Sequence, residues 1–330
     1  MAVSIEDIKK LRAMTGAGLA DVKKALTEAE GDFDKAKDLL RERGLAIAAK
    51  RSDRETSNGC VLVKKEGNFA AMVAVKCETD FVANGADFIA MVQQILDAAV
   101  AAKAQSLDEV KALKIGDQDA AAVVTQRSGI TGEKMEIDGY NFIEGENVEV
   151  YDHMNKHTLA TMVQLNQNNA EAGHKVAMQV AAMKPVALNE ESVSQATKDE
   201  ELKVAIEKTK EEQIARQVNV ALKKAGINPA HVDSEDHIES NTKKGWLTEE
   251  QAAQAREIIK TEGEKAAANL KEQMIQNIAK GRLAKFFKES CLVNQEFIKA
   301  ENKENVAAYL KAADKDLKVV AFKRFTLRAD

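Results

Sequence analysis

Apolar residues in the first fifty positions recur every three or four residues, in three runs separated by short glycine-containing breaks. The first run starts at Ile5 and includes Leu11, and the breaks lie at 15–18 and 31–32. Such spacing is typical of amphipathic helices, and glycine favours turns between them. The pattern predicts a small bundle of three helices, the third of which ends near Gly44.

Two later stretches alternate apolar and polar residues in the way that β-strands do. A hairpin is predicted at 61–75 around a turn at 66–68, and an apolar stripe at 88–99 predicts a helix after it. The same order returns with a hairpin at 148–165 and a helix at 170–183. Because hairpin followed by helix occurs twice, we expect a core of two related α+β halves with antiparallel sheets.

Residues 193–280 differ, because they are rich in Glu, Lys, Gln and Ala and carry few apolar positions. One interruption, at 226–245, contains Pro229. We expect two long antiparallel helices joined at a tip, forming a protruding coiled-coil arm in which about 30 residues reach roughly 45 Å. After the arm, Val319, Val320 and Phe322 predict a closing strand.

These patterns together predict an α+β fold with four parts. The expected parts are an N-terminal helical domain with its linker at 1–52, a first core half at 53–140, a second core half at 141–192 plus 281–330, and the arm at 193–280.

Composition narrows the class of protein. The net charge is −5 with both signs interleaved, whereas a general nucleic-acid binder carries a basic excess. The three cysteines show no metal-binding spacing, and no uncharged apolar run reaches the length that spans a membrane. The N-terminal sequence is charged at once and lacks the apolar core of a secretory signal. We expect a cytoplasmic protein with no cofactor, no metal, no membrane contact and no direct contact with nucleic acid.

The segment 78–83 reads ETDFVA and directly follows the first predicted hairpin. Phe81 lies seven residues before Phe88, so it could begin the apolar stripe with Asp80 as the helix N-cap. The Asn-Gly pair at 84–85 interrupts that stripe, however, and favours a Phe81 that precedes the helix and faces outward. An exposed phenylalanine beside an acid is a plausible interface anchor. The pattern leaves both readings open.

Two other segments carry weaker signals. A Gly-x-Gly turn at 16–18 precedes a helix and could hold a phosphate, but no strand comes before it and Asp21 stands where a third glycine would fall, which favours a tight turn between helices. Lys285 and Lys288 flank two aromatic residues and could bind RNA, although a solvated basic face over packed phenylalanines is the more common arrangement.

Catalytic signals are sparse. His153 with Cys291 could be imagined as a nucleophile pair, but nothing in the sequence brings the two together. Cys60 and Cys77 alternate with apolar residues in predicted strands, so we expect them to be buried. A thiol enzyme is therefore the least favoured reading.

Four segments occur in the order found in bacterial elongation factor Ts, and the chain resembles that family over nearly its full length. These segments are TGAGLADVKKAL at 15–26, ETDFVA at 78–83, AMQVAAMKP at 177–185 and GRLAKFFKESCLVNQEFI at 281–298. The resemblance implies an N-terminal domain similar to ubiquitin-associated domains, a two-part α+β core and a protruding coiled coil. The chain departs from the family pattern at Gln179, where relatives often have His, and at 130–134, which resembles the family's Ile-Gly-Glu-Asn segment only loosely.

The resemblance also implies a function. It predicts a guanine nucleotide exchange factor, not an enzyme, that binds elongation factor Tu and promotes the release of GDP in translation elongation. By this resemblance, the residues that press on the GTPase domain near its magnesium and phosphate site are Thr79, Asp80, Phe81 and Val82. Those through which the N-terminal domain would grip the same GTPase domain are Leu11, Thr15, Gly16, Gly18 and Leu19. The second core half would hold another domain of the partner.

Two rival functions remain possible from the residues alone. An enzyme would turn over a small substrate without any partner, and a passive adapter would bind its partner without changing the rate at which GDP leaves.

Overall fold

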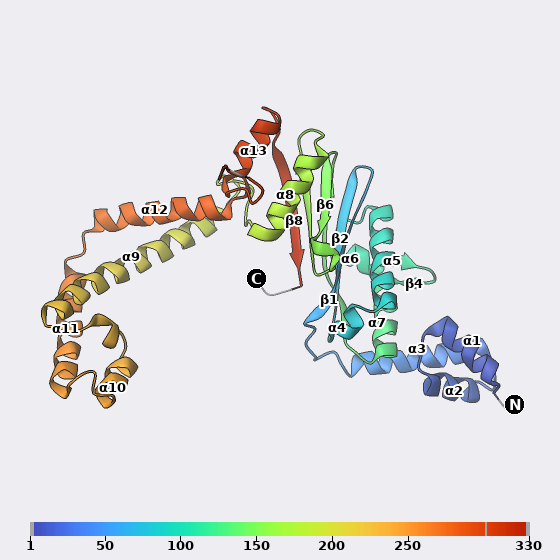
Figure 1. Cartoon of the computed structure of the whole chain (residues 1–330). Coiled ribbons are helices and arrows are strands. Elements are labelled where there is room, and N and C mark those ends of the chain that lie inside the picture. Colours follow the sequence, from blue (N-terminus) through green and yellow to red (C-terminus); the bar gives the residue numbers. More distant parts are fainter. Residues whose placement is uncertain (1–2, 301, 328–330) are drawn as a thin grey trace. The chain divides into compact units, whose positions relative to one another are not determined.

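The computed structural model describes residues 3–300 and 302–327 (Figure 1). The chain forms two compact units. The first combines Met1–Leu188 with Gln295–Asp330, and the second is Asn189–Asn294. None of the helices in the described part of the chain is both long and apolar enough to cross a membrane.

The three expected N-terminal helices are present in the first unit. They are α1 (Ile5–Thr15), α2 (Leu19–Glu28) and α3 (Phe33–Ala49). Ser4 caps α1 by accepting a hydrogen bond from the backbone N–H of Asp7, and Gly16 ends it in the left-handed conformation, which glycine adopts without strain. The buried residues of this part form a cluster of their own around Leu11 and Leu26.

The expectation that α3 ends near Gly44 is wrong, because the helix continues to Ala49. Gly44 packs against Gly129 of α7 (Ala120–Thr131), and a Cβ atom on Gly129 would lie only 2.2 Å from the Cα atom of Gly44. The two glycines therefore allow α3 and α7 to cross in close contact. In a sequence, a glycine used for packing cannot be told from one that ends a helix.

Two antiparallel sheets of three strands form the core of the first unit. The first sheet has the order β1-β2-β5, with β1 (Asn58–Glu66), β2 (Phe69–Cys77) and β5 (Met135–Glu144). The second has the order β6-β7-β8, with β6 (Val148–Asp152), β7 (Leu159–Leu165) and β8 (Val319–Thr326). Both expected hairpins and the closing strand are confirmed.

The sheets pack face to face, and helices cover their outer faces (Figure 1). Val61 and Met72 of the first sheet share one apolar cluster with Met162 of the second. Gly139 of β5 makes room for Phe325 of β8, since a Cβ atom there would lie 1.9 Å from the phenylalanine ring. Helices α5 (Ala86–Ala102) and α7 cover the first sheet, and α8 (Ala170–Met183) covers the second.

Several elements between the two halves were not expected. They are α6 (Leu107–Ala112), β3 (Lys114–Ile115), β4 (Gln118–Asp119), α7 and β5. The expected boundary after residue 140 falls inside β5, which pairs with β2 along its whole length, so the first half continues to Glu144. A register shift opposite Ala74 and Val75 changes the alternation inside β5. The apolar residues that face the core cluster change from Met135 and Ile137 to Tyr140 and Phe142, and this change of phase hides the strand in the sequence.

The second unit is built from helices that pack along α9 (Gln195–Lys224). Both α11 (Glu249–Ala268) and α12 (Glu272–Ser290) contact α9, and α10 (Glu235–Lys243) lies with α11 (Figure 1). The expected single returning helix is therefore two helices. The expected interruption at 226–245 contains α10 and the short helix η2 (Pro229–His231). One apolar cluster of the second unit joins Val218 and Leu222 of α9 to Ile238 of α10 and to Leu247.

The expected end of the arm at residue 280 lies inside α12, and the compact unit continues to Asn294. Phe286 and Phe287 lie within the expected second core half at 281–330, but they belong to the second unit. The remaining described elements are α4 (Asp80–Ala83), η1 (His153–Asn155), η3 (Leu292–Asn294) and α13 (Val306–Ala313).

Candidate protein-binding site

Phe81 projects from a single turn of helix, α4 (Asp80–Ala83), that joins β2 to α5. Its side chain is 88% exposed, whereas the other nine phenylalanines, all in the described part of the chain, are buried or half-buried. Val82 and Ala83 pack towards the core cluster beneath the first sheet. Because successive helical residues point about 100° apart, Phe81 is left facing solvent. The reading in which Phe81 begins the buried stripe is excluded.

The backbone around Phe81 is fixed at both ends, and we call residues 78–85 the Phe81 turn. Thr79, not Asp80, is the N-cap, and its hydroxyl accepts a hydrogen bond from the N–H of Val82 at 3.4 Å. At the other end, the side-chain amide of Asn84 donates to the carbonyl of Asp80 at 2.8 Å. The turn therefore presents a large apolar side chain on an ordered backbone.

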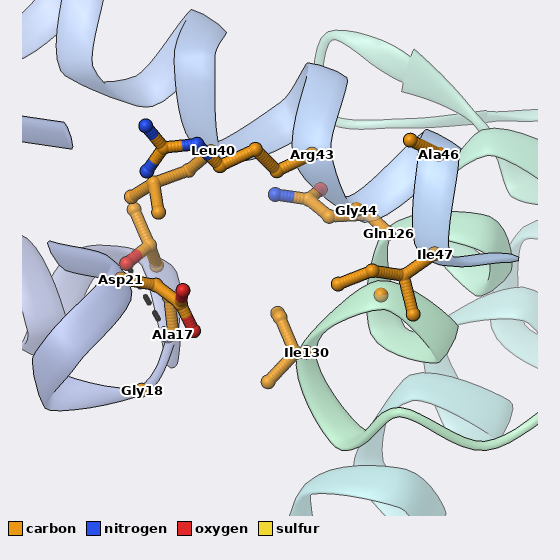
Figure 2. A pocket seen from close by; sticks show the side chains of 12 residues that line it. Ala17, Gly18, Asp21, Leu40, Arg43, Gly44, Ala46, Ile47, Gln126 and Ile130 are labelled. Atoms are coloured by element: carbon orange, nitrogen blue, oxygen red, sulfur yellow. Dashed lines mark hydrogen bonds between the residues drawn. The ribbon is translucent and has the colours of Figure 1, made fainter. Parts of the chain in front are cut away.

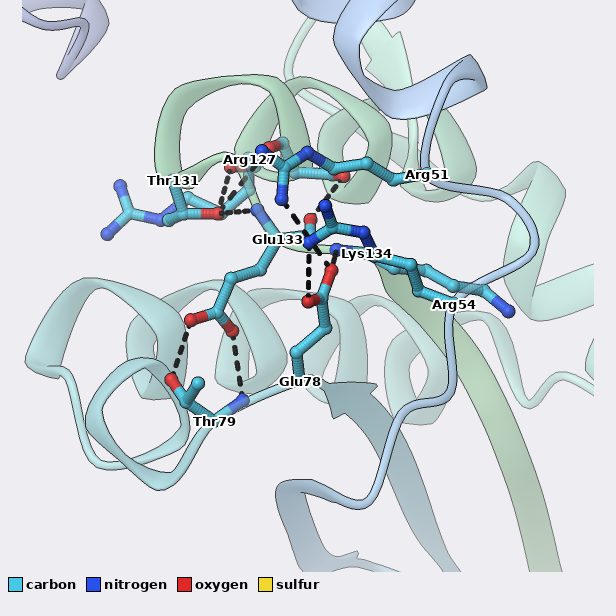
Figure 3. A network of polar contacts seen from close by, with 9 residues as sticks. Arg51, Arg54, Glu78, Thr79, Arg127, Thr131, Glu133 and Lys134 are labelled. Carbon is cyan, nitrogen blue, oxygen red and sulfur yellow. Dashed lines mark hydrogen bonds and ion pairs between the residues drawn. The ribbon is translucent and has the colours of Figure 1, made fainter.

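A carboxylate from a distant segment holds Thr79 (Figure 3). Glu133 follows α7 and accepts two hydrogen bonds from Thr79, one from the hydroxyl at 2.6 Å and one from the backbone N–H at 3.1 Å. Glu133 is itself held, because its N–H donates to the hydroxyl of Thr131 and its carbonyl accepts from the hydroxyl of Ser128. The start of α4 is thus tied to the segment between α7 and β5.

Glu78 makes a second tie beside the first (Figure 3). Its carboxylate accepts from the backbone N–H of Lys134 at 2.6 Å and pairs with Arg54 at 3.0 Å and more loosely with Arg51 at 3.9 Å. The hydrogen bond from Lys134 is the main reason that the pKa of Glu78 is lowered, and the Arg54 guanidinium lowers it further. The site is therefore joined to the segment that follows α3.

The TGAG turn (residues 15–18) is a tight connection between α1 and α2, as expected. Gly16 lies in the left-handed region with φ 68°, and Gly18 is the N-cap of α2 without any side-chain cap. The side chain of Thr15 donates to the carbonyl of Leu11 at 2.7 Å. Leu19 is 57% exposed and stands beside the turn.

A hollow of about 250 Å³ adjoins the TGAG turn (Figure 2). Ala17 and Gly18 line one side, and Ile47 of α3 and Ile130 of α7 project into it from the other. The hollow is mostly apolar, and Asp21 adds a carboxylate.

Leu11 cannot contact a partner as the sequence suggested. Its side chain is fully buried in the cluster of the N-terminal helices. The helical stripe that made Leu11 visible in the sequence is the stripe that packs inward. Of the predicted residues in this part, Gly16, Gly18 and Leu19 are exposed and Thr15 is partly exposed.

The candidate catalytic residues His153 and Cys291 belong to different compact units. His153 lies 3.1 Å from the hydroxyl of Tyr151. Burial raises the pKa of the Cys60 and Cys77 thiols to about 12 and also raises that of Cys291. The described residues contain no group of three His, Cys, Asp or Glu side chains placed to hold a metal ion.

The basic segment of α12 is partly neutralised by its neighbours. Lys285 pairs with Glu289 at 3.7 Å, Arg282 pairs with Glu212 of α9, and Phe286 packs edge-on against Phe287. This is the arrangement expected of a solvated face over packed aromatic rings.

Gln179 is fully buried in α8. Its amide N–H groups donate to the side chain of Gln295 and the carbonyl of Glu296, and its oxygen accepts from the N–H of Ile298 at 2.9 Å. The residue therefore fastens the segment after the second unit to α8.

The model of the family described as Elongation factor TS matches residues 78–219 and 204–329. The chain belongs to the elongation factor Ts family. It is 60% identical to an elongation factor Ts of Bacteroides fragilis, 58% to that of Phocaeicola vulgatus and 39% to that of Porphyromonas gingivalis, and each comparison covers the whole of both chains.

The family match begins at Glu78, so the Phe81 turn lies within it from its first residue. The N-terminal helices precede the matched range but are included in the full-length relatives. The sequence alone does not point to Glu133. A threonine before a short helix is a preferred N-cap, and nothing in that pattern indicates that a distant carboxylate orients it. The carboxylate that holds it lies 54 residues away.

Proposed function

We propose that this chain is a guanine nucleotide exchange factor that binds elongation factor Tu and promotes the release of GDP in translation elongation. The observation that carries the proposal is the exposed Phe81 on a capped turn, within the segment that matches the family. In this mechanism Phe81 enters between helices of the GTPase domain near its magnesium and phosphate site. Metal coordination there is disturbed, the phosphate-binding loop loosens, and GDP leaves. Thr79, Asp80 and Val82 complete the contact.

The N-terminal helices grip the same GTPase domain through the TGAG turn. Gly16, Gly18 and Leu19 are exposed on this turn, and Met14, 54% exposed, precedes it. The hollow between Ile47 and Ile130 offers an apolar seat for a side chain of the partner. Exposed apolar side chains on an ordered turn are suited to such a contact, because little conformational entropy is lost on binding.

The second core half holds another domain of elongation factor Tu. Its surface exposes several large apolar residues in the first compact unit: Met183, Val186, Ile298 and Val320. A contact here anchors the protein while Phe81 acts on the nucleotide site.

The protein acts on a partner and is not itself an enzyme in this proposal. Its three cysteines are buried with raised pKa values, so no thiolate is available at neutral pH. We propose further that α1 to α3 are the ubiquitin-associated-like domain and that the second unit is the coiled-coil arm of the family. The protein would work in the cytoplasm, without direct contact with nucleic acid.

The direct test is the release of a fluorescent GDP analogue from purified elongation factor Tu, followed by stopped flow with unlabelled GDP in excess. Addition of this protein should accelerate release many-fold and in proportion to complex formation. A protein that binds elongation factor Tu and leaves the release rate unchanged would be an adapter, which would overturn the proposal.

A further inference from the structure

Phe81 owes its position to the backbone of the Phe81 turn, because its own side chain is almost fully exposed. The helix that carries it, α4, is only four residues long. One helical turn is not stable alone, since forming the first turn fixes several residues for one hydrogen bond. Contacts from elsewhere must therefore hold this turn in shape.

The contact at its start is made by both oxygen atoms of one carboxylate. Glu133 accepts from the backbone N–H of Thr79 with one oxygen and from the hydroxyl with the other. By donating its only hydroxyl hydrogen to Glu133, Thr79 keeps its oxygen lone pairs free to accept from the N–H of Val82. The carboxylate thus orients the group that caps α4.

Glu133 is a firm support because the segment around it is ordered. Its backbone is hydrogen-bonded on both sides, to Thr131 and to Ser128 at the end of α7. The next residue, Lys134, donates its N–H to Glu78, the residue before Thr79. Glu78 and Thr79 of the Phe81 turn are therefore hydrogen-bonded to Lys134 and Glu133, two consecutive residues after α7.

We propose that Glu133 is a positioning residue for nucleotide exchange, which holds Phe81 in place through the capping threonine. The inference rests on the proposed exchange function and adds a residue to it. When Phe81 inserts into a GTPase, either the Phe81 turn or the GTPase must change its conformation. With Glu133 in place the Phe81 turn keeps its conformation, so the GTPase changes its own. Without Glu133, α4 unwinds on binding, and binding no longer opens the nucleotide site.

The test compares Glu133→Gln with Glu144→Gln, the same substitution at the last residue of β5. Glutamine keeps the size and one acceptor oxygen but loses the charge and the second acceptor. For Glu133→Gln we expect the GDP release rate at saturating protein to fall about tenfold, the loss that one charge-assisted hydrogen bond can cause. The dissociation constant for nucleotide-free elongation factor Tu should change far less, because the rest of the docking surface remains. Glu144→Gln should match the wild type.

Substitutions of Thr79 test the same interaction from its other partner. Thr79→Val should lose about as much of the release rate as Glu133→Gln, and the double variant should lose little more than either, because both remove one interaction. Thr79→Ser keeps the hydroxyl and should recover most of the rate. Additive losses in the double variant would contradict the proposal.

Amide hydrogen exchange of the free protein tests the geometry without any GTPase. The N–H groups of Thr79 and Val82 should exchange faster in Glu133→Gln, while those of α5 keep their protection. Equal protection, or full release activity of Glu133→Gln beside an active wild type, would overturn the positioning role alone. A wild type that fails to accelerate GDP release would instead overturn the exchange function.

Discussion

A phenylalanine exposed in the free protein brings a limited amount of free energy to a complex. Burying one such side chain contributes roughly 1.5–3 kcal/mol, which corresponds to a shift of about 10- to 150-fold in an equilibrium. Phe81 alone is therefore too small to open a tightly closed nucleotide site. Under the proposed exchange function, the surrounding contacts supply the remainder and Phe81 directs that free energy to the nucleotide site.

Two leucines near the TGAG turn should behave in opposite ways. Leu11→Ala removes a fully buried side chain and should destabilise the N-terminal helices by about 2–5 kcal/mol. Leu19→Ala removes a largely exposed one and should leave stability within about 0.5 kcal/mol while weakening partner binding. Amide exchange of α1 to α3 measures the first effect, and a binding titration with elongation factor Tu measures the second. Equal stability of the two variants would contradict this assignment.

At the scale of single residues, the sequence picks out candidate segments but does not give the direction of their side chains. The spacing of Phe81 and Phe88 fits one continuous stripe, yet the two belong to different helices, because α4 ends before Asn84 and α5 starts after Gly85. Leu11 was expected to contact the partner because it belongs to a prominent helical stripe, but that stripe faces inward. Exposure depends on where a helix begins, and that is decided by caps and by distant partners such as Glu133.

At the scale of elements, the close crossing of α3 and α7 joins the N-terminal helices to the core. A Cβ atom added to Gly129 would lie 2.2 Å from Gly44, whereas one added to Gly44 would lie 3.6 Å from Gly129, an ordinary contact. We expect Gly129→Ala to cost several kcal/mol, since neither helix backbone can move aside easily, and Gly44→Ala to be tolerated. Urea unfolding of both variants measures the difference. Equal effects of the two substitutions would mean that the crossing is looser than described.

The tie between Glu78 and the segments around it should make stability depend on pH. Because its folded pKa is lowered, Glu78 contributes stability that is complete above the unfolded pKa of about 4.3 and is lost as the pH falls through the folded value. The difference in unfolding free energy between wild type and Glu78→Gln should therefore be largest near pH 7 and shrink below about pH 4. Urea titrations across that range measure it. A difference that does not vary with pH would show that the charge of Glu78 contributes nothing.

The sequence predicted those elements whose apolar spacing is regular and missed those that are short or polar. Both hairpins, α5 and α8 follow from spacing alone, because each buries one clear face. Strand β5 was not predicted because a register shift changes its alternation, and α10 was not predicted because it lies in a polar tip. Such elements are held by their neighbours, through strand pairing or a small apolar cluster, and a local pattern does not record those contacts.

At the scale of the whole molecule, exchange is a negative coupling between two ligands of the GTPase. The coupling is reciprocal, so nucleotide must weaken binding of this protein by the same factor by which the protein weakens binding of nucleotide. In this account, the first compact unit carries all the contacts that produce the coupling. The second unit carries none of them.

The second unit should accordingly be removable. Gln295 is anchored in the first unit, where its side chain donates to the carbonyl of Met183 at 3.0 Å, so a short Gly-Ser linker can join it to Leu188 in place of Asn189–Asn294. We expect this deletion to fold and to retain most of the acceleration of GDP release. Stopped-flow release, with circular dichroism as the control for folding, measures it. Collapse of exchange in a folded deletion would assign an essential contact to the second unit.

The most direct measurement of the central claim compares Phe81→Ala with Trp246→Ala in both GDP release and binding to elongation factor Tu. Trp246 is 63% exposed and lies in the second unit, so it controls for the loss of an exposed aromatic side chain. The account predicts that Phe81→Ala lowers the saturating release rate by about 10-fold or more, lowers affinity much less, and leaves stability unchanged, while Trp246→Ala behaves as wild type. Equal losses of release rate and affinity in Phe81→Ala would make Phe81 only an anchor and would contradict the account.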